Sequence, residues 1–299
     1  MRRSQGRYVK QPVMIAASAM AMLAMTNARA GGPSSGISEQ LQEVTITAHR
    51  EELLARVSKF VDQIATVENA EGLPRWQKPV CPLVSGIAGQ DGEFILGRVS
   101  EIARAAGVPL AGENCRPNLY ILVHPQPMQL LLAMEKRNRL YTFGDDSPPQ
   151  SVIDRFIATP QTVKTWYTSQ ERTPEGVSLL RRPSDPPPLV RGEGSRLMSS
   201  AVWSLERVFV IVDQTRLQGI KRGQFADYVA MSGFAKLKPD ARPGDAPTIL
   251  TLFNGAPETA PAGMTDWDQT FLKSLYATDQ KSKQQRSQIA RSMVRDMAP

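Results

Sequence analysis

The side chains that could carry out acid–base, nucleophilic or metal chemistry are few in this chain. Its 299 residues include two histidines, His49 and His124, and two cysteines, Cys81 and Cys115. A histidine-rich zinc site cannot be built from them, and a zinc site drawing on the cysteines needs both unpaired. A Ser-His-Asp triad would lack the G-x-S-x-G turn that presents the serine, and a thiol nucleophile needs a free cysteine near His124. Carboxylate pairs, which hydrolyse glycosides without histidine, stay open.

Three candidate cleft residues, Asp213, Asp227 and Tyr228, lie at and after one strongly apolar run. That run, Val-Phe-Val-Ile-Val at 208–212, is rich in β-branched side chains and predicts a strand buried on both faces. Residues 223–237 place apolar side chains at spacings of three and four, which predicts a helix. The strand and helix would border a cleft into which these side chains project.

The predicted helix resembles a zincin helix, His-Glu-x-x-His/Gln-x-x-Gly-Leu, with its ligands replaced. The matching residues are Ala226-Asp227-Tyr228-Val229-Ala230-Met231-Ser232-Gly233-Phe234. The chain is similar to a proteobacterial secreted and lipoprotein family, a domain of unknown function. The likeness covers about two thirds of the mature chain. It continues through four further segments: Arg75-Trp76-x-x-Pro79, residues 249–253, Met264-Thr265-x-x-Asp268, and Phe271-Leu272-x-x-Leu275-Tyr276.

The resemblance implies a zincin-like fold, but the residues at the ligand positions imply that its metal has been lost. Ala226 and Ala230 stand where the family has metal ligands, and a methyl group has no lone pair to give to zinc. Asp227 is one methylene shorter than the glutamate that acts as general base. We therefore expect no metal and no cofactor. Ala226, Ala230 and Gly233 instead form a seam of small side chains that predicts close packing.

The first 30 residues predict an export signal. Arg2, Arg3, Arg7 and Lys10 precede an apolar stretch at 12–25, and Ala28-Arg29-Ala30 fits a cleavage site. The mature chain would begin at Gly31, be periplasmic or secreted, and keep no transmembrane segment. Removing this segment leaves 31 basic and 29 acidic side chains, a net charge of +2. A balance so close to neutral disfavours nucleic acid as a partner.

A βαβ unit is predicted from two apolar runs, 80–84 and 118–123, with a helix at 92–106 between them. Cys81 and Cys115 each lie beside the start of one of the two strands. Because the strands would be parallel, both cysteines would lie at the same end of the pair. In an oxidising compartment this predicts a Cys81–Cys115 disulfide.

The remaining segments complete a single α+β domain with a mixed sheet and packed helices. Residues 31–70 are expected to hold an extended segment at 41–50 and an amphipathic helix at 51–67, and residues 71–278 the domain itself. Within it, Thr265 and Asp268 predict a capped helix over 265–277, and the Arg/Pro-rich stretch 181–196 predicts a surface loop, with anion binding as the alternative. Residues 279–299 predict an amphipathic helix that docks on the domain or on a partner.

Two functions follow as expectations. The first is a non-catalytic binding or assembly module for an envelope protein or other ligand. The second is a metal-independent hydrolase of the cell envelope that uses cleft carboxylates such as Asp213 and Asp227. Carboxylates converging on one cleft would favour the hydrolase, whereas an apolar or aromatic groove would favour binding.

Overall fold

The structure is a computed structural model of the chain, and it describes residues 35–67, 72–140, 148–179, 195, 198–239, 241–255 and 257–298. The chain divides into two compact units, Met1–Thr45 and Ile46–Pro299. The described part of the first unit, residues 35–45, is helical, and the second unit contains the sheet. The predicted signal at 1–30 and nearly all of the predicted loop at 181–196 lie outside the described residues.

The sheet is mixed and has four strands in the order β1-β2-β4-β3. The first three of these are parallel, and β3 runs antiparallel to β4 at the edge. The strands are β1 (Pro82–Ser85), β2 (Leu119–His124), β3 (Val163–Arg172) and β4 (Val202–Asp213). The predicted α+β class and mixed sheet are therefore confirmed. The strands predicted at 80–84 and 118–123 are β1 and β2, shifted by one or two residues, whereas β4 begins six residues before the predicted run 208–212.

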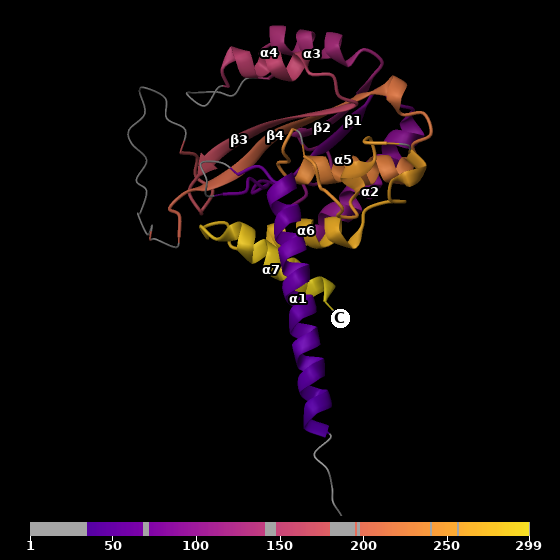
Figure 1. Cartoon of the computed structure of the whole chain (residues 1–299). Helices are drawn as coiled ribbons and strands as arrows, with labels where there is room; N and C mark the ends of the chain where they lie inside the picture. The colour runs from indigo at the N-terminus through magenta and orange to yellow at the C-terminus, as the bar shows by residue number, and fades with distance from the viewer. Residues whose placement is uncertain are drawn as a thin grey trace, which may run out of the picture. The chain divides into compact units, whose positions relative to one another are not determined.

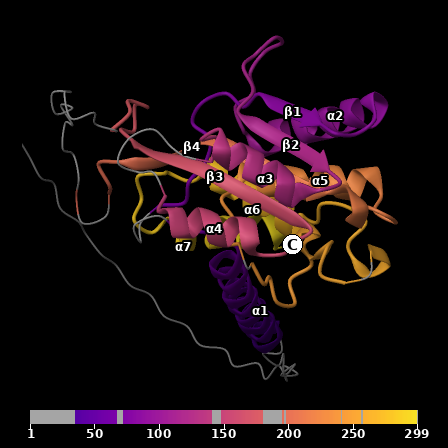
Figure 2. The same cartoon turned by 90° about the horizontal axis from the view of Figure 1, so that it is seen from above.

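Helices cover both faces of this sheet. Figure 1 shows α3 and α4 on one face and α2 and α5 on the other, and the view in Figure 2 shows α3 and α4 lying over β3 and β4. The helices are α1 (Ser35–Ile64), α2 (Gly89–Ala106), α3 (Pro127–Lys136), α4 (Gln150–Ala158), α5 (Arg222–Phe234), α6 (Asp266–Ala277) and α7 (Gln285–Met297). Short 3-10 turns occur at Gln214–Arg216, Ile249–Thr251 and Pro257–Thr259.

The larger core lies on the α2/α5 side of the sheet and draws in the end of α1 as well as α6 and α7. Phe60 of α1 meets the rings of Trp267 and Phe271 of α6 edge-on, with centroids 5.3 and 6.1 Å away. Ile289 and Met293 of α7 are fully buried in the same core. The C-terminal helix thus docks on its own domain.

The seam of small side chains on α5 packs as predicted. Ala226 and Ala230 have no exposed surface. A Cβ added at Gly233 would lie 3.0 Å from both methyl carbons of Leu119 on β2. Trp76 Nε1 also donates to the carbonyl of Gly233 at 2.8 Å. Even a methyl group at Gly233 would therefore force Leu119 or α5 to shift.

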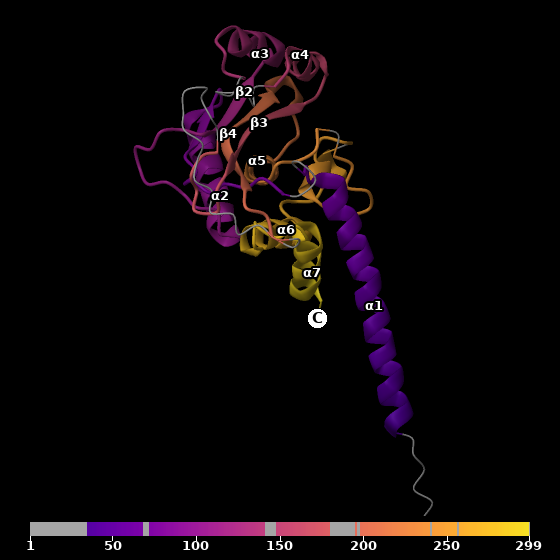
Figure 3. The ribbon, with the colours of Figure 1, turned by 90° about the vertical axis from the view of Figure 1, so that its left-hand side faces the viewer.

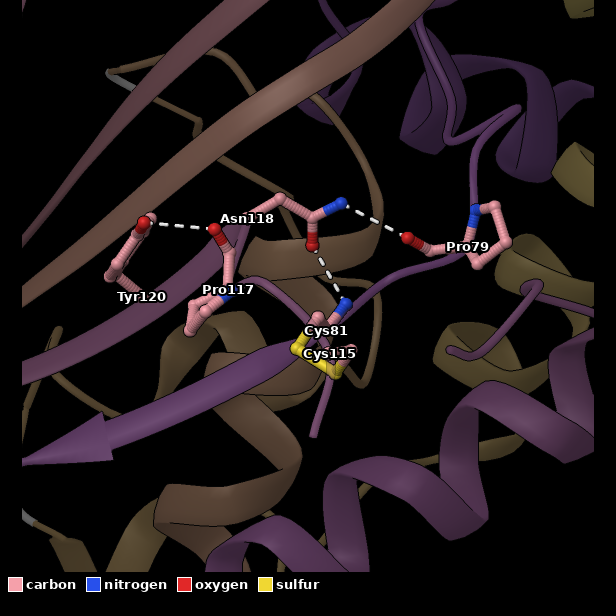
Figure 4. Close-up of a disulfide and its surroundings, with 6 residues drawn as sticks. All are labelled: Pro79, Cys81, Cys115, Pro117, Asn118 and Tyr120. Carbon is pink, nitrogen blue, oxygen red and sulfur yellow. Dashed lines mark hydrogen bonds between the residues drawn. A yellow bond between two sulfur atoms is a disulfide. The ribbon is translucent and has the colours of Figure 1, made fainter. Parts of the chain in front are cut away.

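The predicted disulfide is present and joins the starts of β1 and β2 (Figure 4). Cys81 and Cys115 are 34 residues apart in sequence, and their Cα atoms are 5.9 Å apart. Asn118 ties the same end together, because its Oδ1 accepts from Cys81 N at 2.7 Å and its Nδ2 donates to the carbonyl of Pro79 at 3.0 Å.

Two local predictions have opposite outcomes. The prediction of an extended segment at 41–50 is wrong, since these residues belong to α1. Its β-branched run is short and flanked by Glu, Gln, Leu and Arg, which favour helix, so the helix continues through it. The capped helix is confirmed, because Thr265 and Asp268 form a reciprocal capping box at the start of α6.

No helix among the described residues combines the length and the apolar character that crossing a membrane requires.

Candidate functional site

A cleft of about 920 Å³ opens at the end of the sheet where β4 finishes and β3 begins. Its lining comes from the start of α3, the first half of β3, the turn after β4, helix α5 and two later segments around Leu237 and Phe253. Gln161 on the approach to β3 donates to the carbonyl of Pro239 at 3.0 Å, which holds the later segment against the strand. Figure 3 shows β3 and α5 from the side. The volume is in the range of pockets that bind small ligands or short peptide segments.

Four aromatic side chains from the described part of the chain line the cleft: Phe156, Tyr167, Tyr228 and Phe253. Tyr228 of α5 meets Phe253 edge-on, with centroids 4.8 Å apart. Tyr167 of β3 donates its hydroxyl to the carbonyl of Ser232 at 2.8 Å, which fixes the strand to α5. Burial raises the pKa of Tyr228 to about 12 and raises that of Tyr167 as well, so both phenols stay neutral.

The charged side chains of the cleft are mainly basic. Among the described lining residues, Asp213 is the one carboxylate, against Lys164, Arg216 and Lys238. Lys164 donates to the carbonyls of Phe156 and Ile157 at 2.8 and 2.6 Å, at the end of α4. Burial lowers the pKa of Lys164. This ammonium is held by the fold, whereas Arg216 is exposed and open to solvent.

β3 presents a free backbone edge to this cleft within the part of the chain that the structure describes. Asp213 N donates to the carbonyl of Thr162 at 2.9 Å, directly across from it on the other strand. Hydrogen bonds alternate along an antiparallel pair, so Lys164 and Trp166 also turn their backbone groups toward β4. The N–H and C=O groups that turn outward belong to the alternate residues Val163, Thr165 and Tyr167.

The structure brings Asp213 and Tyr228 into the lining of one cleft but does not bring Asp227 to it. Asp227 is buried on another side of α5, where it pairs with Arg98 of α2 through Nε at 2.7 Å and Nη2 at 3.2 Å. It also accepts from Met264 N at 2.6 Å. Its hydrogen bond raises the pKa of Arg98. Asp227 thus ties α2, α5 and the segment before α6 together.

Asp213 itself is engaged locally. Its Oδ1 accepts from Thr215 N at 2.9 Å and from Thr215 Oγ1 at 2.6 Å, which caps the 3-10 turn after β4. Asp227 does not join Asp213 here, so the described lining of the cleft holds no pair of carboxylates.

The positions that the resemblance assigns to metal ligands do not face the cleft. Ala226 and Ala230 are fully buried in the core, and the α5 residues one turn apart in the cleft lining are Tyr228 and Ser232. Within the described residues, no group of three or more histidine, cysteine, aspartate or glutamate side chains is placed to hold a metal ion. His124 ends β2, and its Nδ1 accepts from Gln126 N at 3.0 Å. His49 lies on α1.

The sequence predicts Trp166 and Tyr167 on a strand or groove wall, and the structure places both on β3, with Tyr167 in the cleft lining. Sequence reasoning did not find Thr165 or Phe253 as cleft residues. Thr165 and Tyr167 belong to a strand whose other face buries polar side chains such as Lys164 and Thr168, so it lacks an apolar alternation. Phe253 follows a buried 3-10 turn.

No family model matches this chain, and neither a curated protein nor a solved structure matches it.

Proposed function

We propose that this chain is an exported, non-catalytic binding module whose cleft takes an extended peptide segment as an added strand on β3. The observation that carries this proposal is the outward row of N–H and C=O groups at Val163, Thr165 and Tyr167 beside an aromatic cleft. An edge strand pairs readily with another extended chain, and neighbouring pockets then select alternate side chains. Residues 1–30 support export.

The cleft chemistry favours binding over hydrolysis. A carboxylate mechanism needs two acidic groups on either side of the bond that breaks. The described lining offers Asp213 alone, already bonded to Thr215, while Tyr228, Phe253 and Tyr167 offer rigid aromatic surface. Aromatic walls with a few fixed polar groups are typical of recognition sites.

Proline at position 165 tests the proposal. Thr165 turns its N–H outward, so Thr165→Pro removes a donor to the added strand without removing a bond to β4. We expect this variant to fold and to lose binding of a dye-labelled pool of uncharged peptides, roughly six residues long with alternating apolar and polar positions. Fluorescence anisotropy measures binding, and circular dichroism measures folding.

Three further variants complete the test. Thr165→Ala keeps the N–H and should bind like the unmodified chain, whereas Lys164→Pro removes a bond to β4 and should destabilise the fold. Tyr228→Ser should weaken binding through the loss of aromatic contact. Undiminished binding by a folded Thr165→Pro variant contradicts strand addition at β3.

A further inference from the structure

A second, shallow hollow of about 560 Å³ adjoins the cleft and shares Lys238 with it. The hollow is lined by residues of α1 and of the segment after α5: Lys59, Asp62, Gln63, Lys238 and Arg242. A peptide lying along β3 and leaving the cleft past Lys238 would therefore pass directly over this hollow.

The described residues that line the hollow carry a net positive charge. The one carboxylate among them, Asp62, already accepts from Arg286 Nη1 at 2.7 Å, so its negative charge is balanced within the protein. Lys59 and Arg242 are exposed, and neither forms an ion pair with another residue that the structure describes. Lys238 is exposed as well and donates to the backbone carbonyl of Asp62 at 2.6 Å, which leaves its charge unneutralised.

The cleft adds to this excess of positive charge. Arg216 at its wall is exposed, and the carboxylate of Asp213 is bonded to Thr215. The cations Lys59, Arg242 and Lys238 thus continue a cleft that is itself basic. Unpaired surface charge of one sign beside a binding groove attracts the opposite charge and sets the direction in which a partner docks.

We propose that the peptide partner carries acidic side chains on the flank that leaves the cleft past Lys238, with its apolar or aromatic residues held inside the cleft. The partner class is thus an extended segment of an acidic protein. This proposal rests on the function proposed above, and it adds an electrostatic requirement that strand addition alone does not need.

Three dye-labelled peptide pools with the same alternating core test the requirement. One pool is flanked by glutamates, one by lysines and one by serines. We expect the mature chain to bind the glutamate pool about tenfold more tightly than the lysine pool at low salt, with the ratio falling as salt is added. The double variant Lys59→Glu with Arg242→Glu should reverse this order and leave binding of the serine pool unchanged.

The control is the double variant Arg104→Glu with Arg291→Glu, which changes two exposed cations outside both hollows and should keep the preference for glutamate. Equal binding of all three pools, or a preference that survives the reversal at Lys59 and Arg242, overturns the acidic flank while leaving strand addition in place. Failure to bind any pool overturns the proposed function along with it. Loss of serine-pool binding in the Lys59/Arg242 variant also overturns the proposal that these two residues recognise an acidic flank, because they would then act on the cleft itself.

Discussion

Asp268 shows how a single buried carboxylate can hold two segments together. It is fully buried, and its oxygens accept from the Thr248 hydroxyl, from Ile249 N at 2.9 Å and from Thr265 N at 2.9 Å. The same group caps α6 and fixes the turn that leads to Phe253 in the cleft. Every partner is a donor, so both oxygens must accept.

Asp268→Asn therefore should destabilise the fold. The amide replaces one accepting oxygen with a donor, which leaves a buried N–H or O–H without its partner at a cost of about 1–3 kcal/mol. Urea unfolding of both proteins measures the difference. Asp266→Asn alters the exposed carboxylate two residues earlier and should cost less than about 1 kcal/mol. Equal stability of the two variants would mean that Asp268 contributes only a favourable negative charge at the N-terminus of α6 and that its buried hydrogen bonds add nothing.

At the scale of elements, α5 approaches β2 closely at Gly233. Ala230 is fully buried, and Leu119 packs against the same face of α5 near Gly233. Ala230→Leu should overfill this contact and lower the free energy of unfolding by about 1–3 kcal/mol. Thermal and urea unfolding measure the loss. Ala133→Leu, on an exposed position of α3, is the matched control and should stay within about 0.5 kcal/mol.

The elements that sequence reasoning found are those whose apolar residues follow one period. Val208 to Val212 and the stripe of α5 could be predicted because strand and helix each bury a continuous apolar set. β3 could not be predicted with its full length, since Lys164, Gln170 and Arg172 are buried with hydrogen-bonding partners and break the pattern.

The candidate site was only partly predictable for a geometric reason. Asp227 and Tyr228 are neighbours in sequence, but successive helix residues point about 100° apart. Tyr228 therefore reaches the cleft while Asp227 reaches Arg98 on the opposite helix. Which of two adjacent side chains faces a cleft depends on the rotation of the helix about its axis, and that rotation is fixed by packing contacts such as the one between Gly233 and Leu119.

At the scale of the whole molecule, the disulfide limits how far the chain can expand on unfolding. Cys81–Cys115 closes a loop of 34 residues that contains α2. Reduction, or Cys81→Ala with Cys115→Ala, should lower the free energy of unfolding by about 3–4 kcal/mol on the chain-entropy account. Guanidinium unfolding with and without reductant measures this. A reductant effect on the double alanine variant would point to a cause other than the bridge.

The floor of the cleft is joined to the end of α1 by a short two-way pairing. Thr66 N donates to the carbonyl of Lys236 at 3.0 Å, and Lys238 N donates to the carbonyl of Ile64 at 2.8 Å. Leu237 and Lys238 of this segment also line the cleft. A ligand in the cleft and a change at the end of α1 would therefore both act on the same short segment, residues 236–238.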